Sequence, residues 1–372
     1  SVVTDAGDYV PLESDPGLEP DPGTEEVTLN DGDVWRNLGL GIDSSSAWFL
    51  VVDGDVSGTQ IDSLMARISD QAPPEGTQFW LNYMSFEPNG FEVVSDDPEL
   101  GVASVGLLNP AGDTYVLCDQ DLNDDNASFQ LAIRSEPGAD DSTLSGDYFV
   151  AMLHSDTSQA PGFFTGWYDV NFSGGGLLEF MTAVNDREFD DYGPVSPVPY
   201  SIGDGGDLVV SNPMVPEPPF PRDLFGQARA DGELFTLAET RGYPETPDNT
   251  YKTLFFGARY SSNATDALLE GTWTLASVSS AFHTGEPTDF WETAYQLTLD
   301  QNGDGTLVDL DTSESEPISV DLNPDGSFQL PPGSGDPENE GIVTPSGDTL
   351  ILVSPRESSD MDYNITIGVK NP

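Results

Sequence analysis

The sequence predicts an all-β fold made of three tandem units. Two observations predict it. One pattern, a short strand, a glycine turn and a second strand, occurs three times, and apolar and polar residues alternate around it as they do in β-strands. The turns centre on Gly112, Gly232 and Gly347, more than a hundred residues apart. A repeat of this length is typical of a small β-domain rather than of one coil of a solenoid.

Each turn places glycine where a tight hairpin needs a positive φ. A later strand in every copy ends in a small residue, an apolar residue and a base. These endings are Ala132-Ile133-Arg134, Gly257-Ala258-Arg259 and Gly368-Val369-Lys370. Because the chain has only 11 Lys and Arg, three bases at matching places strengthen the repeat.

The repeat divides the chain into an extended arm over 1–32 and β repeats over 33–140, 141–266 and 267–372. Alternation in the last repeat predicts about eight strands in an antiparallel meander, the number at which a sheet closes into a small barrel. We therefore expect three barrel-like or sandwich-like units. The alternative is a six-bladed β-propeller with two four-stranded blades per repeat.

One helix is expected inside the first repeat. Ile61, Leu64, Met65 and Ile68 recur at helical spacing, which predicts a short helix over 60–72.

The net charge of the chain limits which partners it can bind. With 66 acidic and 11 basic residues among 372, the formal net charge is −55. Binding to phosphates requires a basic footprint, so the composition excludes nucleic acid as a partner. No segment is apolar enough for direct membrane insertion. Monovalent or divalent cations are the expected partners, since they screen such repulsion, and a halophilic or marine source fits this surface.

The N-terminal arm suggests assembly. The sequence begins without Met, which we interpret as removal of an export signal, so the expected location is secreted or cell-surface. The arm is rich in Pro, Asp and Glu, and it either lies on its own unit or adds a strand to another copy, giving a homo-oligomer or homopolymer. The apolar side chains that would anchor it are Val2, Val3, Tyr9 and Leu12.

One acidic loop resembles the start of a calcium loop. Oxygen-bearing residues at the first, third and fifth positions precede a glycine at the sixth, and the carbonyl of the seventh is a further ligand. The predicted Ca²⁺ ligands are Asp300, Asn302, Asp304, Thr306 and Asp311. The other interpretation is a simple strand-to-strand turn, because ligands are fewer at the same place in the other repeats.

No catalytic or cofactor motif is found, and the only histidines are His154 and His283. We therefore predict no enzymatic activity. The expected function is that of an exported extracellular or cell-surface structural or adhesive β-repeat protein, with a filament subunit as one form. The alternative is a secreted carbohydrate-binding module or a glycoside hydrolase that uses paired carboxylates.

Overall fold

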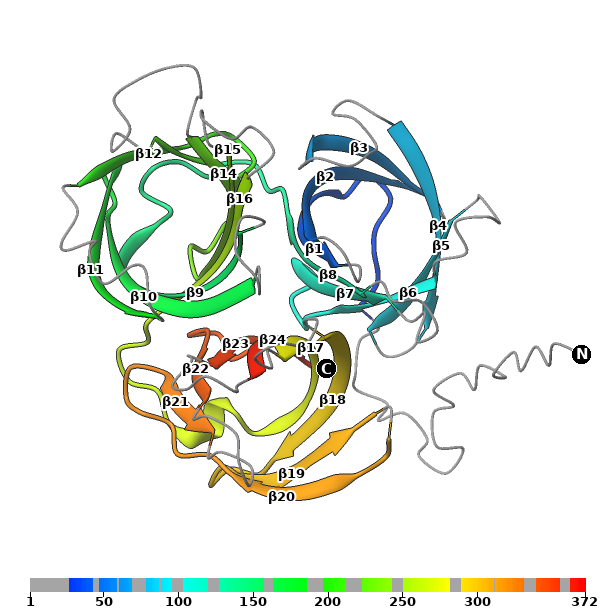
Figure 1. The fold of residues 1–372 in the computed structure, drawn as a ribbon, viewed down its shortest axis with the longest axis vertical. Helices are drawn as coiled ribbons and strands as arrows, with labels where there is room; N and C mark the ends of the chain where they lie inside the picture. Colours follow the sequence, from blue (N-terminus) through cyan, green and yellow to red (C-terminus); the bar gives the residue numbers. More distant parts are fainter. Residues whose placement is uncertain are drawn as a thin grey trace, which may run out of the picture.

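The fold is all-β and consists of three successive units of eight antiparallel strands, as the sequence predicts. Figure 1 shows the units of this computed structural model grouped around a common centre. The structure describes residues 27–42, 47–58, 60–68, 78–86, 89–95, 103–119, 127–156, 163–185, 197–211, 223–242, 250–281, 289–310, 312–330, 339–354 and 362–372.

The first unit is a closed barrel, because its first strand pairs with both the second and the eighth. Its strands are β1 (Val34–Ile42), β2 (Ala47–Ser57), β3 (Gln60–Ile68), β4 (Gln78–Phe86), β5 (Gly90–Ser95), β6 (Ala103–Leu108), β7 (Thr114–Asp119) and β8 (Ala127–Arg134).

The second unit closes in the same way, through pairing of its first and last strands. Its strands are β9 (Ser145–Asp156), β10 (Phe163–Ser173), β11 (Leu177–Asn185), β12 (Val198–Ile202), β13 (Asp207–Ser211), β14 (Asp223–Ala228), β15 (Leu234–Gly242) and β16 (Thr250–Arg259). Closure of eight strands into one barrel shows that the six-bladed propeller alternative is wrong.

The third unit is an eight-stranded sheet that ends in two edges, β20 and β21. A single 3₁₀ turn, Asp266–Leu268, precedes it. Its strands are β17 (Gly271–Ala281), β18 (Asp289–Leu299), β19 (Asp304–Asp309), β20 (Ser315–Ser319), β21 (Ser327–Leu330), β22 (Asn339–Val343), β23 (Thr349–Ser354) and β24 (Asp362–Lys370).

The helix predicted over 60–72 is wrong, because residues Gln60–Ile68 form strand β3. Its backbone pairs with β2 on one side and with β4 on the other, and a register shift occurs opposite Val51 and Val52. Ile61 is buried in the interior of the barrel. A short apolar run fits both the helical and the strand periodicity. Here, pairing with the two neighbouring strands makes the segment a strand. Residues 69–72 lie outside the described ranges.

Each unit has its own apolar core. The first contains Trp35, Phe91 and Tyr115, and Tyr115 contacts Trp35 at a tilt and Phe91 edge-on. The second contains Tyr148, Phe172 and Phe235, and the third is built around Trp273 and Phe328. At eight strands a barrel is just wide enough for side chains to fill it, and these aromatic residues do so.

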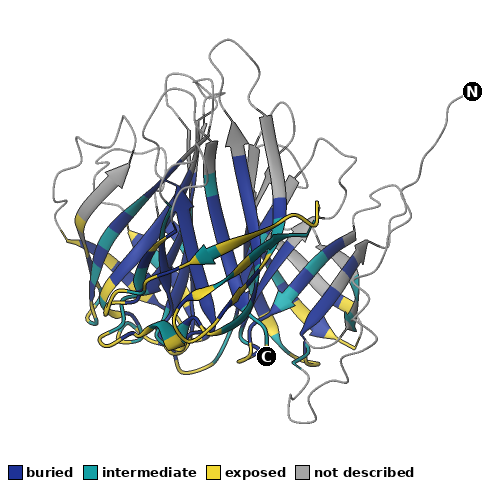
Figure 2. Ribbon diagram, turned by 90° about the horizontal axis from the view of Figure 1, so that it is seen from below, coloured by how far each residue is buried: buried dark blue, intermediate teal, exposed yellow. Residues whose placement is uncertain are grey.

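A fourth core lies between the units, and strands with two apolar faces build it (Figure 2). Strand β9 shows the principle: Phe149, Ala151 and Leu153 enter this central core, while Tyr148, Val150 and Met152 belong to the core of the second unit. Phe129 meets Phe256 of the second unit edge-on at 5.9 Å between ring centroids.

The three units contact each other in one repeated way. Strands β1 and β2 contact β16, β9 and β10 contact β23, and β17 and β18 contact β8. The first two strands of each unit therefore lie against the end of the next unit's sheet, and the third returns to the first. The three units of the chain therefore form a closed ring (Figure 1).

The small residue before each base is explained by the strand beside it. Gly257 lies opposite Phe235, and a Cβ on Gly257 would stand 2.2 Å from that ring. Gly368 lies opposite Leu350, whose side chain would be 2.8 Å from an added Cβ. A larger residue at either position would displace the core of its unit.

No helix in the described ranges has the length and apolar character needed to cross a bilayer.

Truncation in the central core should destabilise the protein. Ile367 of β24 is fully buried there, so Ile367→Ala should lower the free energy of unfolding by about 2–5 kcal/mol. Denaturant unfolding measures the loss. The control is Met181→Ala on the outer face of β11, where the side chain is 57% exposed and a change within about 0.5 kcal/mol is expected. An equal effect of the two substitutions would contradict the central core.

Candidate functional site

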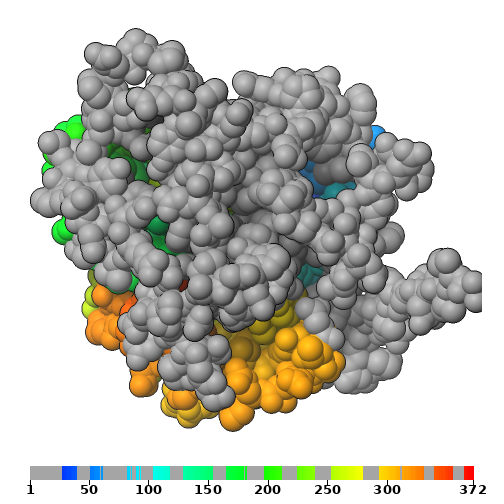
Figure 3. Space-filling model, viewed as in Figure 1, coloured from blue at the N-terminus to red at the C-terminus, as the bar shows by residue number. Residues whose placement is uncertain are grey.

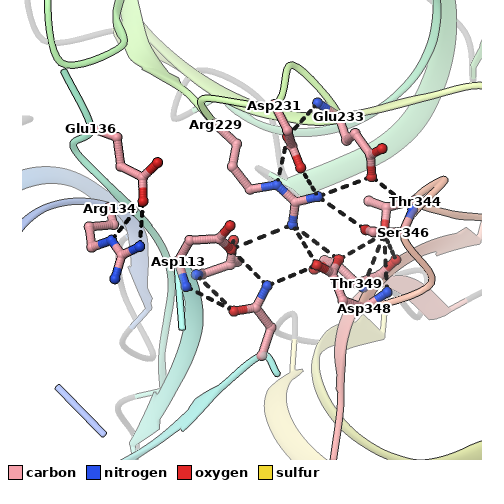
Figure 4. Close-up of polar contacts among 12 residues, drawn as sticks. Asp113, Arg134, Glu136, Arg229, Asp231, Glu233, Thr344, Ser346, Asp348 and Thr349 are labelled. Atoms are coloured by element: carbon pink, nitrogen blue, oxygen red, sulfur yellow. Dashed lines mark hydrogen bonds and ion pairs between the residues drawn. The ribbon is translucent and has the colours of Figure 1, made fainter. Parts of the chain in front are cut away.

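The three glycine turns meet where the units join, and their charged residues form one group there (Figure 4). Each turn has the same geometry. The amide of the glycine donates to the carbonyl of the residue three positions earlier, at 2.8–2.9 Å, and φ at Gly112, Gly232 and Gly347 lies between 66° and 71°. The predicted positive φ at these glycines is confirmed.

The repeated turns also share an acid directly after the glycine: Asp113, Glu233 or Asp348. The backbone carbonyl of each acid accepts a hydrogen bond from the amide of the repeat's base, at 2.8–2.9 Å. This bond fixes the acid against the end of the last strand of its unit. All three side chains contact Arg229, the first residue of the second turn.

Arg229 is the centre of this group, which we call the central charge cluster: Asp113, Arg229, Asp231, Glu233 and Asp348. Its side chain is only 1% exposed. Nη1 lies 3.0 Å from Asp348 and 3.7 Å from Asp113, and Nη2 lies 3.2 Å from Glu233. Burial acts to lower the pKa of Arg229, but the surrounding carboxylates outweigh it and keep the pKa above its ordinary value.

Asp348 is the most buried of the carboxylates around the guanidinium. Both of its carboxylate oxygens accept from Nη1 of Arg229, and the hydroxyl of Thr344 donates to the same group at 2.9 Å. Burial acts to raise the pKa of Asp348. Attraction to Arg229 and these hydrogen bonds exceed that effect, so the pKa lies below its ordinary value.

Asp113 is held more weakly. Burial raises its pKa, and the attraction of the more distant Arg229 offsets only part of that rise. The amide of Asn109 donates to Asp113 at 2.8 Å and to Asp348 at 3.1 Å, so one side chain links the acids of two units. The two carboxylates thus share their partners but have pKa values shifted in opposite directions.

Further polar contacts surround the cluster. Glu233 also accepts from Arg259 at 3.3 Å and from the backbone amide of Ser346 at 2.8 Å. Elsewhere Thr165 of the second unit donates to the carbonyl of Ser354 in the third at 2.6 Å. The arrangement is suited to holding the units together, because its charged groups form ion pairs and hydrogen bonds with one another.

The predicted calcium ligands form a closed turn. Asp300 accepts from the backbone amides of Asn302 at 2.7 Å and Asp304 at 3.2 Å, and the first of these bonds lowers the pKa of Asp300. Asp304 accepts from Ser319, and Thr306 lies within β19 opposite Thr298. Asp311 lies outside the described ranges.

Within the described part of the chain, no three His, Cys, Asp or Glu side chains are grouped so that they could hold a metal ion. The turn interpretation accounts for the hydrogen bonds seen at Asp300. Calcium binding there stays a prediction.

The predicted assembly residues Val2, Val3, Tyr9 and Leu12 also lie outside the described ranges. The described end of the arm, residues 27–32, packs on its own unit, where Leu29 is 5% exposed within the core of the first barrel.

Sequence reasoning missed the central charge cluster although it found the turns. A signal was present: one copy has Arg229 where the others have Asn109 and Thr344, and all three have an acid after the glycine. What the repeat alone does not contain is the convergence of the three turns.

The fold defines the chain as a protein of three eight-stranded β units around a shared core. No family model matches the chain, and no curated protein matches it. Among solved structures, a double mutant of Transferrin Binding Protein B from Haemophilus parasuis Hp5 is 9% identical, with 91% of this chain and 75% of that chain covered and a TM-score of 0.29.

Two further structures are similar to the same degree. Isotype 1 Transferrin binding protein B from serogroup B Neisseria meningitidis is 10% identical over 87% of this chain and 66% of that chain, with a TM-score of 0.31. A DUF3598 family protein of unknown function from Nostoc punctiforme PCC 73102 is 11% identical over 91% and 95%, with a TM-score of 0.22. With TM-scores below 0.5, these likenesses carry no conclusion about what this chain does.

Removal of the central cation should destabilise the whole ring. Arg229→Met leaves several buried carboxylates without their partner, so we expect a loss of about 3–5 kcal/mol in the free energy of unfolding. Denaturant titration measures it. The matched control is Arg134→Met, where the side chain is 22% exposed and pairs with Glu136, and where a loss within about 1 kcal/mol is expected. Equal losses in the free energy of unfolding for the two variants would contradict the central role of Arg229.

Two of the acids beside Arg229, Asp348 and Asp113, should respond oppositely to neutralisation. Asp348 has a lowered folded-state pKa, so it stabilises the fold above the unfolded value of about 3.9 and loses that contribution as pH falls through its folded-state pKa. Asp113 has a raised pKa, so its ionisation opposes folding as pH rises through the folded-state value. At pH 7 we therefore expect Asp348→Asn to lose stability and Asp113→Asn to lose none or to gain.

Thermal unfolding from pH 7 to pH 3 measures both differences from the wild-type protein. The Asp113→Asn difference should shrink as pH falls through the raised folded-state pKa of Asp113. The Asp348→Asn difference should begin to shrink only below about pH 3.9, because that carboxylate keeps its charge in the folded state down to its lowered pKa. A destabilised Asp113→Asn variant at pH 7, equal to Asp348→Asn, would contradict the assignment.

Proposed function

We propose that the protein is a non-enzymatic scaffold with a structural or adhesive role, located outside the cytoplasm or at a cell surface. One observation carries the proposal: among the described residues, large side chains of each unit occupy its own interior, with Phe91, Phe172 and Phe328 each at most 1% exposed. A barrel that carries a ligand needs an interior larger than its side chains.

The joining of the units supports a rigid body. The central core and the central charge cluster connect all three, and β1 adds Arg36, which pairs with Asp53 of its own unit and with Asp207 of the second. Inter-domain motion is expected unless the interface is large and apolar, and this one is apolar at its centre. A rigid, strongly acidic particle suits a role in display or spacing.

The tryptophans whose side chains the structure describes favour the scaffold over the carbohydrate-binding alternative. Trp35 and Trp273 are buried in the cores of their units, and Trp167 stacks on Phe149 at 5.5 Å. A sugar-binding platform requires aromatic faces open to solvent. Homopolymer assembly through the arm and calcium binding are not needed for this proposal and stay predictions.

Two measurements test the proposal. The purified chain should neither hydrolyse a panel of aryl glycosides nor bind an array of immobilised glycans, and antibodies against it should label intact cells of its source. An antibody to a cytoplasmic protein, which labels only permeabilised cells, is the control. Glycoside turnover that one Asp→Asn substitution removes would overturn the scaffold, and labelling that requires permeabilisation would overturn the location.

A further inference from the structure

The third unit has an open edge. Strand β20 pairs with β19 over Ser315–Ser319, and among the described residues no strand pairs with its other side. Figure 3 shows this part of the unit, in orange, at the outside of the molecule. An unpaired edge is a template on which a strand of another chain can add.

Hydrogen bonds of the flanking residues show which groups of β20 face that edge. The amide of Val320 donates to Gly303, and the carbonyl of Glu314 accepts from Asp309, so both residues face β19. Facing alternates along a strand. Glu316 and Ile318 therefore also face β19, and Ser315, Pro317 and Ser319 present their backbone groups to the open side.

Pro317 is the middle one of these three positions, and proline has no amide hydrogen. The open edge consequently offers carbonyls at all three positions but donors only at the two ends. The ladder bond that an added strand would require at the centre is missing. Proline within sheets is confined to such edge positions.

The side chains of β20 also oppose the addition of a strand to the open edge. Ile318 is partly buried against the core of the third unit, and Leu307 of β19 beside it is likewise only partly covered. Glu316 shares the face of Ile318 and is exposed. A charge on the inward face of an edge strand opposes burial of that strand in a continued sheet.

We propose that Pro317, supported by Glu316, keeps the open edge of the third unit from pairing with a strand of a second copy of this chain. The edge exists because the third sheet does not close, and its apolar inner face would otherwise favour such pairing. Acidic repulsion alone is a weaker protection, because salt screens it. This assignment goes beyond the scaffold function and does not depend on it.

The test restores the missing donor. Pro317→Val should associate in a concentration-dependent manner, with a weight-average mass that rises above that of the wild-type chain measured at the same concentration. Sedimentation velocity in about 1 M salt, where the Debye length is about 3 Å, removes charge repulsion as the cause. Hydrogen exchange at the amide that this substitution introduces should slow as concentration increases.

Ser315→Val is the matched control, since it places the same side chain on the same face of β20 and adds no donor. It should keep the mass of the wild-type chain. If Pro317→Val does not fold, Pro317→Ala, which adds the donor with a small side chain, should associate instead. The wild-type mass in both folded proline variants, equal association of Ser315→Val, or a wild-type dimer with protected Ser315 and Ser319 amides would each overturn the proposal.

Discussion

The structure depends on one guanidinium that is shared by three turns. Arg229 is almost fully buried, and a buried cation is costly unless charge and hydrogen bonds surround it. Asp231 and Glu233 of its own turn pair with Arg229 within the second unit, whereas Asp113 and Asp348 reach it only when the three units are assembled. The central apolar core holds the units together, and the central charge cluster fixes their relative position.

Apolar and charged residues are concentrated on different strands rather than in different units. Strands near the centre, such as β9 and β23, are apolar on both faces, because one face fills their own unit and the other fills the central core. Strands far from the centre, such as β20, are mostly exposed and take up acidic residues. A chain with a net charge of −55 can keep four apolar cores in this way, since most of its carboxylates lie where water and counterions reach them.

The sequence predicted the fold class because glycine geometry is local. Gly112, Gly232 and Gly347 need a positive φ whatever surrounds them, and their recurrence gave the three units. The strand at Ile61 was mistaken for a helix, since the two neighbouring strands that decide its period are distant in sequence. The central charge cluster was missed for a related reason. Asp113 and Asp348 meet only through the closure of the ring, and no local pattern contains that closure.

Only one of the three repeated turns has an arginine at the position of Arg229, and this limits the symmetry that the assembly can have. Three identical barrels on a true threefold axis would bring three arginines to the same point, where their charges would repel and their side chains would collide. In this chain the equivalent positions are Asn109 and Thr344, which are uncharged and small enough to serve as donors beside the single cation. Covalent fusion of the repeats lets each copy of one turn diverge separately. A symmetric trimer of one gene product could not make this centre, and a tandem chain can.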